Sequence, residues 1–319
     1  MLKQKATEAL RLKEQYSRAY ETDFDLGKKL ELQYLSLRRE ILDEVDSDIK
    51  RQKSVPIREI KRRVTATPKK PKRATGIRSL DYELVTYKQK MRHETGGFSL
   101  GNIIQIAGSR GAGKTSLMLK MLTSLSNFER VCWMDFEMGE RRVTEKLEDF
   151  AHNEDNLLYY NSSRELSDVI DEIKFLNASG VNHFVIDSTM KLYSKKATDT
   201  YDKFSSISRE LSELTSTIGI NIYIINQMSQ QSERDGALML KGGNDAEYDA
   251  DYIIYILKMK KLENGKIVKD EMGFDIYDED MRLIKCTKNR EDDRTFTVQV
   301  NKSEIFGIIP IEVEYEETA

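Results

Sequence analysis

Residues 103–115 of this chain read IIQIAGSRGAGKT, and the fold follows from them. The last eight residues fit the phosphate-binding pattern G-x-x-x-x-G-K-[ST]. An apolar run at 103–107 precedes the pattern as an expected strand, and SLMLKMLTSL at 116–125 follows as an expected helix. Glycines let backbone amides curl around a phosphate, and the N-terminus of a helix favours its negative charge. The residues expected to bind a nucleotide are Gly108, Ser109, Arg110, Gly111, Ala112, Gly113, Lys114, Thr115 and Ser116.

Hydrolysis of a bound nucleotide needs residues that contact its phosphates, a metal ion and the attacking water. Lys114 is expected to reach the β- and γ-phosphates and Thr115 to hold Mg²⁺. HFVIDS supplies Asp187 as a second acid for the magnesium shell. VCWMDF runs into Glu137, whose carboxylate can orient and deprotonate the attacking water, and Asp135 competes for this role. The residues predict ATP hydrolysis, with ATP and Mg²⁺ as ligands.

Outward from this loop, short β-rich runs alternate with helical stretches. Strands are expected at 103–107, 131–136, 183–187, 220–226, 252–258, 281–287 and 295–300, and helices are expected to begin near Thr115, Glu140, Arg164 and Tyr201. Such alternation predicts right-handed βαβ crossovers and an α/β fold, with a mainly parallel sheet flanked by helices. The last strands follow one another without helical spacers, so we expect an antiparallel edge.

Residues 1–53 form a helical arm in this interpretation. Apolar residues recur there at helical spacing, which predicts two amphipathic helices. Thr22 and Asp25 bracket the expected break in an arrangement like a capping box. Two interpretations are open: a packed helical hairpin, or an arm for self-association or for docking a protein partner.

The arm leads into a basic, proline-containing linker at 54–75. From Lys50 to Arg73 the chain carries eleven basic residues and one acid, Glu59. A run of this kind is either a solvated, flexible segment or a source of contacts to nucleic-acid phosphates. The expected motor domain follows at 76–310, and 311–319 forms an acidic tail.

Composition excludes several classes of protein. Lysine and arginine number 51 against 54 aspartate and glutamate, a net charge of −3, with 39% apolar residues. This profile is typical of a globular protein with charged exposed helices. No apolar run approaches a membrane span, and the first residues are too charged for a secretion signal, so we expect a cytoplasmic protein without membrane contact. The chain has only two cysteines, Cys132 and Cys286, which is too few for a disulfide scaffold. Its three histidines, His93, His152 and His183, are too scattered in the sequence to indicate a zinc cluster.

These motifs resemble the RecA-like ATPases, and most closely the motor domain of the DnaB-type hexameric replicative helicases. The resemblance runs from about Thr75 to Phe306. ATGIRSLDYEL and GGFSLGNIIQIAGSRGAGKTSLMLKM are similar to the first segment, lead strand and P-loop of that family. NDAEYDADYIIYILK is similar to its later acidic segment and strand. The large N-terminal domain of DnaB-type helicases has no counterpart here, since about fifty helical residues stand in its place.

The resemblance implies roles for single residues. WMDFEMGE is similar to the strand that ends in the family's catalytic glutamate, Glu137 here, and FVIDS to the magnesium-shell strand with Asp187. NIYIINQMSQQSERDG implies that Gln227 senses phosphate. KCTKNRED resembles the basic finger pair, Lys288 and Arg290, which in this family reaches the γ-phosphate bound to the adjacent subunit.

The same resemblance implies a homo-oligomeric ring, a hexamer, that binds single-stranded DNA in its channel and translocates by ATP hydrolysis. The loops after Asp187 and Gln227 face the channel in RecA-like rings. Their basic residues are the expected DNA contacts: Lys191, Lys195, Lys196, Arg234 and Lys241.

Two alternatives stay open. KGGN at 241–244 is closer to the DNA-binding loop of RecA-type recombinases, which favours a filament-forming recombination ATPase. RadA-type repair ATPases share the K-N-R triplet but carry a cysteine zinc finger, which this sequence does not contain. A nucleotide-switched assembly protein that recruits partners through its helical arm is the alternative of another class.

Overall fold

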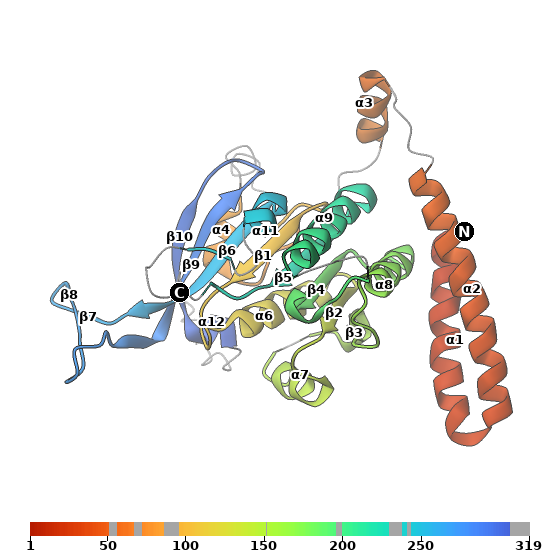
Figure 1. Ribbon diagram of the computed structural model, residues 1–319, viewed down its shortest axis with the longest axis horizontal. Helices are drawn as coiled ribbons and strands as arrows, with labels where there is room; N and C mark the ends of the chain where they lie inside the picture. Colours follow the sequence, from red (N-terminus) through yellow and green to blue (C-terminus); the bar gives the residue numbers. More distant parts are fainter. Residues whose placement is uncertain are drawn as a thin grey trace, which may run out of the picture.

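The computed structural model describes residues 1–50, 56–66, 72–85, 96–150, 152–195, 200–229, 238–240 and 244–306. An eight-stranded sheet forms its centre, in the order β10-β9-β6-β1-β5-β4-β2-β3 (Figure 1). Its strands are β1 (Ile103–Ala107), β2 (Val131–Asp135), β3 (Leu157–Tyr160), β4 (His183–Asp187), β5 (Asn221–Ile225), β6 (Tyr252–Lys260), β9 (Tyr277–Asn289) and β10 (Phe296–Asn301). The six strands from β6 to β3 in this order are parallel, whereas β9 and β10 are antiparallel. The predicted α/β class, the mainly parallel sheet and the antiparallel edge are confirmed.

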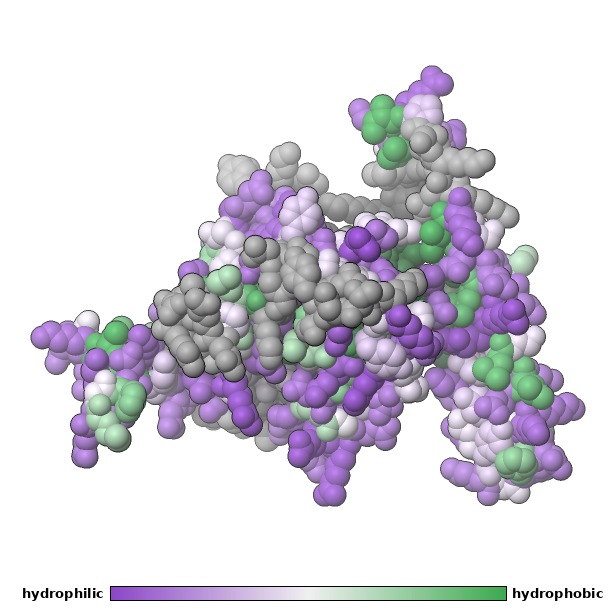
Figure 2. Space-filling view, in the orientation of Figure 1, coloured by the Kyte–Doolittle hydropathy of each residue, from purple (hydrophilic) through white to green (hydrophobic). Residues whose placement is uncertain are grey.

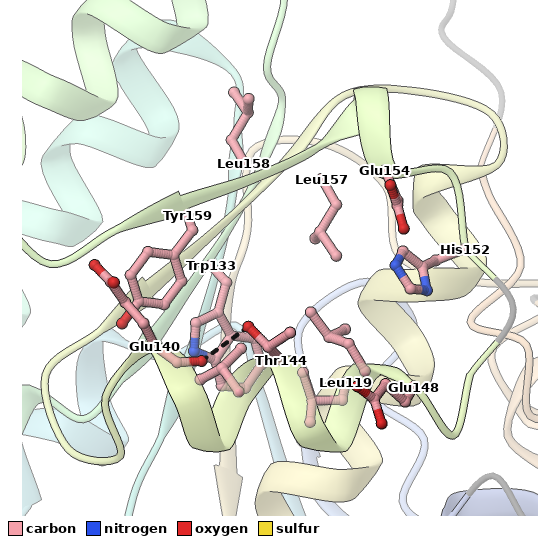
Figure 3. Close-up of a pocket in the computed structure, with 12 residues that line it drawn as sticks. Leu119, Trp133, Glu140, Thr144, Glu148, His152, Glu154, Leu157, Leu158 and Tyr159 are labelled. Atoms are coloured by element: carbon pink, nitrogen blue, oxygen red, sulfur yellow. Dashed lines mark hydrogen bonds between the residues drawn. The ribbon is translucent and has the colours of Figure 1, made fainter. Parts of the chain in front are cut away.

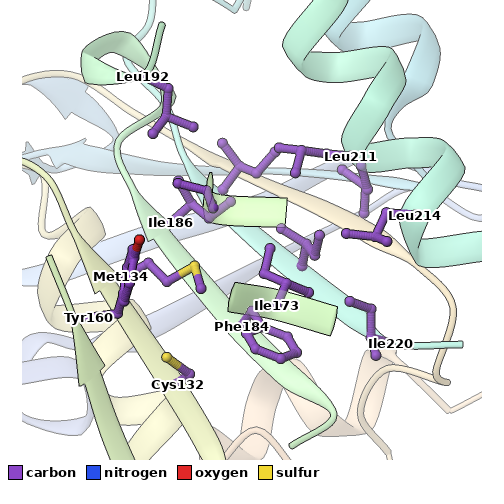
Figure 4. Packing of buried hydrophobic residues seen from close by; sticks show 14 of the residues in the cluster. Cys132, Met134, Tyr160, Ile173, Phe184, Ile186, Leu192, Leu211, Leu214 and Ile220 are labelled. Atoms are coloured by element: carbon purple, nitrogen blue, oxygen red, sulfur yellow. The ribbon is translucent and has the colours of Figure 1, made fainter. Parts of the chain in front are cut away.

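Two apolar layers cover the faces of the sheet, because successive side chains of a strand point to opposite faces. One layer joins Cys132, Met134, Phe184 and Ile186 to helices α8 (Leu166–Ala178) and α9 (Thr200–Ile218) (Figure 4). The other joins alternate residues of the same strands, such as Trp133, to α4 (Arg78–Glu83), α6 (Lys114–Ser126), α7 (Glu140–Leu147) and α12 (Lys302–Phe306). Short segments complete the chain: η1 (Glu154–Asn156), η2 (Thr189–Lys191) and α11 (Asn244–Asp249).

The sequence did not reveal three strands. β3 has only four residues, LLYY, so its apolar run is shorter than those of the other parallel strands, and three of the four are at least partly exposed. β7 (Leu262–Glu263) and β8 (Lys266–Ile267) pair with each other outside the main sheet. They belong to an extension between β6 and β9, which projects at one end of the molecule (Figure 1).

The arm is a hairpin of α1 (Leu2–Thr22) and α2 (Phe24–Lys50) that packs on α8 of the same chain. The rings of Tyr34 and Phe175 meet edge to face with centroids 6.1 Å apart. Arg38 Nη2 lies 3.0 Å from Glu172 Oε2 at the same contact. One face of the arm therefore packs within the chain, as the interpretation of a packed helical hairpin predicts.

The break in the arm differs in detail from the expected capping box. Asp23, not Thr22, caps α2, because its extended backbone lets Oδ1 accept the amide hydrogen of Leu26 at 3.1 Å. Thr22 instead donates its hydroxyl to Ala19 O at 3.5 Å.

Part of the basic segment is helical. It contains α3 (Ile57–Ala66), which begins directly after Pro56. Proline suits a helix start because its missing N–H is not needed there. Residues 67–71 and 311–319, including the acidic tail, lie outside the described part of the chain. None of the helices described is long and apolar enough to cross a membrane.

Docking of the arm predicts a difference between two positions of α2. Ile41 is 0% exposed within the core layer of α8, whereas Leu32 is 61% exposed. We expect Ile41→Ala to lower the free energy of unfolding by about 2–5 kcal/mol and Leu32→Ala by about 0.5 kcal/mol or less. Urea denaturation of both variants measures this. Equal effects would show that the arm does not pack on α8.

Candidate functional site

The loop between β1 and α6 has the backbone that the glycine-rich pattern requires. Gly111 and Gly113 have φ values of +73° and +109°, a region that favours glycine. A Cβ atom on Gly108 would lie 2.3 Å from Ile256 O, so the loop can pack against β6 only without a side chain there. Gly113 O accepts the amide hydrogen of Leu117 at 2.8 Å, which starts α6. The expected nucleotide-binding residues thus form one loop and the first turn of a helix.

Lys114 folds onto this loop. Its Nζ donates to Gly108 O at 2.9 Å and to Ser109 O at 3.0 Å. The ammonium group is thereby held within the loop whose amides would surround a phosphate.

Thr115 and Asp187 come together from different strands. Thr115 Oγ1 donates to Asp187 Oδ2 at 3.5 Å. Asp187 is 3% exposed, and its pKa is raised to about 7, chiefly by burial and then by the charges of Glu137 and Asp135. A hydroxyl and a carboxylate are oxygen donors that suit Mg²⁺.

The rest of a magnesium shell would have to come from elsewhere. Among the residues that the structure describes, no group of three or more His, Cys, Asp or Glu side chains could hold a metal ion. Mg²⁺ in sites of this type keeps several waters and binds substrate phosphates, so two protein ligands fit such an ion.

The two candidates for the base differ in their hydrogen bonds. The Asp135 carboxylate accepts the amide hydrogens of Glu137, Met138 and Gly139 at 3.0, 2.9 and 2.6 Å, and the Tyr159 hydroxyl at 2.9 Å. These four hydrogen bonds tie Asp135 to the turn after β2. Glu137 is exposed and receives a hydrogen bond from Ser188 Oγ at 3.2 Å. Glu137 is therefore the carboxylate that is free to meet a water.

Gln227 follows β5 at the same edge of the sheet. Because β5 lies between β1 and β4, its carboxyl end lies between those of the strands that lead to the P-loop and to Asp187. The Gln227 side chain is exposed, and the backbone N–H of Gln227 donates to Asn226 Oδ1 at 2.9 Å.

Lys288 and Arg290 lie at the opposite edge. Their strand, β9, is antiparallel to β6, and Asn289 between them pairs with Tyr252, the first residue of β6. Tyr252 also pairs with Ile104 near the start of β1, whereas the P-loop follows the end of β1. A strand of five residues separates the two edges by roughly 15 Å. The structure does not bring the pair together with the P-loop of its own chain.

Contacts hold the pair in place. Lys288 Nζ donates to the carbonyl oxygens of Glu247 and Tyr248, and Arg290 Nη1 lies 3.3 Å from Asp251 Oδ1. Burial, and then the charge of Arg290, lower the pKa of Lys288.

The expected DNA contacts are described only in part. Lys191 is exposed in η2, directly after β4. Lys195 is exposed too, with Nζ 3.8 Å from Glu165 Oε2. Lys196, Arg234 and Lys241 lie outside the described residues.

Sequence analysis missed Arg282, a residue of β9 that is 6% exposed. Its Nε donates to Ala112 O in the P-loop at 3.2 Å, and Nη1 donates to Met281 O at 2.7 Å and Asp278 O at 3.2 Å. An arginine in an otherwise mixed strand gives no local signal of burial. Only the pairing of β9 with β6 brings it under the loop.

A separate cavity of about 550 Å³ lies between α6, α7, β2 and β3 (Figure 3). Its lining includes Trp133, whose Nε1 has no hydrogen-bond partner within the described parts of the chain. Exposed glutamates stand on its rim: Glu140, Glu148 and Glu154. None of the predicted site residues lines this cavity, so it is not the nucleotide site.

Known structures share this fold. A solved structure of an ATPase domain superposes on 79% of this chain and 95% of that chain, with a TM-score of 0.58 and 20% identity. A DnaB-like replicative helicase, solved to study its interactions with primase, covers 95% of this chain and 75% of that chain, with a TM-score of 0.59 and 18% identity. The protein has the RecA-like P-loop fold.

Sequence relatives agree with this RecA-like fold over a shorter stretch. The DNA repair protein RadA of Campylobacter jejuni is 23% identical over 164 residues, and that of Streptococcus pyogenes serotype M6 is 25% identical over 166 residues. Each match covers 50% of this chain and 34% of the relative, so the chain spans about a third of the length of the curated relatives it matches. No family model matches the chain.

The contact of Arg282 with the P-loop predicts an effect on nucleotide binding. We expect Arg282→Met to weaken binding of a fluorescent ATP analogue about 5- to 30-fold, because a buried carbonyl of the P-loop loses its charged donor. Lys285→Met, which removes an exposed cation from the same strand, is the matched control and should change affinity less than twofold. Equal affinities for both variants would contradict a role of Arg282 in the loop.

Proposed function

We propose that this protein is an oligomeric ATP-dependent DNA helicase or translocase of the DnaB-like type. The observation that carries the proposal is that the residues expected to act in hydrolysis lie at two opposite edges of one sheet. The P-loop, Thr115, Asp187 and Glu137 gather at the carboxyl edge, and a basic pair stands at the amino edge. A complete site then needs two copies of the chain.

Each residue has a place in hydrolysis. Lys114 and the amides of the P-loop bind the phosphates of ATP, and Thr115 and Asp187 hold the magnesium ion. Mg²⁺, when bound, neutralises charge on the phosphates. Glu137 accepts a proton from the attacking water, and Gln227 contacts the γ-phosphate from the neighbouring strand end.

Lys288 and Arg290 supply positive charge to the site of the adjacent copy. Cations of this kind stabilise the charge of the transferred phosphoryl group, and their effect on rate is large. Because the pair lies a strand length from its own P-loop, hydrolysis in this proposal depends on assembly into a ring, for which a hexamer is the expected form.

A second pair of surfaces supports contact between copies. The basic helix α3 exposes Ile57 and Ile60 on an amphipathic face. The apolar cavity beside α7, with its glutamate rim, matches this helix in both polarity and charge. Contact between the two surfaces would join neighbouring copies.

Single-stranded DNA is the molecule along which we expect the protein to translocate. The segments after β4 and β5 start at the nucleotide edge, and the first presents the exposed Lys191 and Lys195. Contacts of lysines to phosphates are independent of sequence and sensitive to salt, which suits a translocating motor.

The RadA relatives favour a second candidate within the same class. These relatives are DNA repair proteins, and their similarity to half of the chain supports an ATPase of DNA repair or recombination. The filament in this alternative rests on the KGGN segment at 241–244. Strand exchange without unwinding of a forked duplex would distinguish this candidate. A nucleotide-switched assembly ATPase would show hydrolysis that is indifferent to DNA.

Steady-state hydrolysis tests the motor proposal. We expect single-stranded DNA to stimulate ATP turnover, and stimulation to fall with rising salt as phosphate contacts are lost. Lys114→Ala provides the blank. Turnover that DNA does not change at any salt concentration would contradict a DNA motor.

Glu137→Gln tests the base. We expect this variant to bind ATP like the unchanged protein and to lose turnover by about 10²- to 10⁴-fold, because the amide accepts no proton. Glu145→Gln removes an exposed carboxylate from α7 that does not line the cavity, and should retain turnover within about twofold. Normal hydrolysis by Glu137→Gln would mean that another group activates the water.

Mixed assemblies test the basic pair. Lys114→Ala keeps the pair but loses its own site, and Arg290→Ala keeps the site but loses the pair. We expect each variant alone to be inactive and their mixture to recover ATP turnover at interfaces that join an intact P-loop to an intact Arg290. A mixture no more active than its components would contradict action across the interface.

A further inference from the structure

The extension between β6 and β9, residues 261–276, consists of the β7–β8 hairpin and a returning segment bridged to it between Lys269 and Asp275, and we call it the wing. Asn264 and Gly265 form its first turn, with φ values of +51° and +75°. Val268, directly after β8, is hydrogen-bonded on both sides, because its N–H donates to Lys261 O and its carbonyl oxygen accepts the N–H of Ile276. Backbone hydrogen bonds within the wing therefore give it a defined structure.

Its apolar side chains have no cover within the described parts of the chain. Met272 is 82% exposed and Phe274 is 65% exposed. Three more are exposed along the same element: Leu262, Ile267 and Ile276. Figure 2 shows this concentration of hydrophobic residues at the projecting end of the molecule. Exposed apolar surface gathered on one element marks an interaction site.

Charge indicates what kind of partner the wing contacts. Its basic residues are Lys261, Lys266 and Lys269, and its acidic residues are Glu263, Asp270, Glu271 and Asp275. Nucleic-acid contacts need an excess of positive charge, and this element has an excess of one negative charge. An exposed apolar element without excess positive charge fits a protein surface better than nucleic acid.

Position indicates which protein. The wing starts where Lys260 pairs with Tyr277, and two residues before, Lys258 pairs with Arg282, which holds the P-loop. Lys258 itself lies beside the loop, since its Nζ would be 3.8 Å from a Cβ atom on Gly111. The wing therefore projects from the nucleotide edge of the sheet, directly next to the P-loop.

The neighbouring copy must arrive at this same edge if its basic pair completes the site. That copy presents an apolar group there, since Tyr248 is 76% exposed and its ring lies under Arg290, 5.9 Å from Cζ. Both edges thus carry exposed apolar side chains beside the groups that must meet.

We propose that the wing docks on the neighbouring copy of this chain, against the surface around Tyr248 and Arg290, and so holds the basic pair over the P-loop beside it. This inference rests on the proposed function, because it takes the arrangement of copies from the action of Arg290 across the interface. Each wing serves the site of its own chain.

The mixture of Lys114→Ala and Arg290→Ala proteins gives a direct test. Met272→Ser with Phe274→Ser is added either to the Arg290→Ala chain, which supplies the working P-loop, or to the Lys114→Ala chain. We expect recovered turnover to fall about tenfold or more in the first case, which corresponds to roughly 1.4 kcal/mol of interface free energy. In the second case it should stay within about twofold, because that wing lies beside a dead site.

Two controls keep the result interpretable. Lys266→Ser with Glu271→Ser removes two exposed charged side chains from the same wing and should leave turnover within about twofold on either chain. Binding of a fluorescent ATP analogue to the Met272→Ser, Phe274→Ser chain should be unchanged, which shows that its P-loop is intact. Equal losses from either chain, or no loss from either, would overturn the proposal.

Sedimentation velocity with ATP separates failure of this proposal from failure of the proposed function. If the mixture with an unchanged wing recovers no turnover, the action of Arg290 across the interface has failed. The wing is then judged by assembly alone: dissociation of the Met272→Ser, Phe274→Ser protein supports docking between copies, and unchanged assembly overturns it. Loss of binding to single-stranded DNA with unchanged assembly would instead assign the wing to DNA and overturn the proposal.

Discussion

Parallel pairing of β1 with β5 and β6 is the constraint on which the other features depend. It sends the carboxyl ends of these strands to one edge, where open α/β sheets collect their ligands. The P-loop, Asp187 and Gln227 meet there although more than a hundred residues separate the first from the last. The reversal of β9 has the opposite effect, because it carries Lys288 and Arg290 to the other edge.

Two aspartates in register show how the sheet treats buried charge. Asp135 and Asp187 are paired residues at the ends of β2 and β4, and both are buried. Three backbone amides and a tyrosine hydroxyl bond Asp135, so its charge is compensated within the chain. Asp187 has the Thr115 hydroxyl, and its pKa is raised to about 7. A carboxylate with few hydrogen-bond donors around it can still bind a cation. By this criterion Asp135 has a structural role, and Asp187 is the candidate metal ligand.

Two of the apolar surfaces that the described residues leave uncovered lie beside the residues of the site. The wing stands next to the P-loop, and Tyr248 stands next to Arg290. The arm, by contrast, has one face buried against α8 and linked to it by the Arg38–Glu172 ion pair. Under the proposed function, contacts between copies involve the motor domain and α3, and nucleotide turnover becomes a property of the assembly.

The sequence by itself determined the P-loop, the strands that lead to Asp187 and Glu137, the α/β class and the antiparallel edge. Those features follow from local causes: apolar runs of strand length, and glycines where φ must be positive. Only the tertiary structure showed that Asp135 accepts hydrogen bonds from the turn after β2 and that Arg282 donates to the P-loop. It also showed that Lys288 and Arg290 lie far from the P-loop of their own chain. Strand order and register bring together residues that are distant in the chain, and no local pattern carries that information.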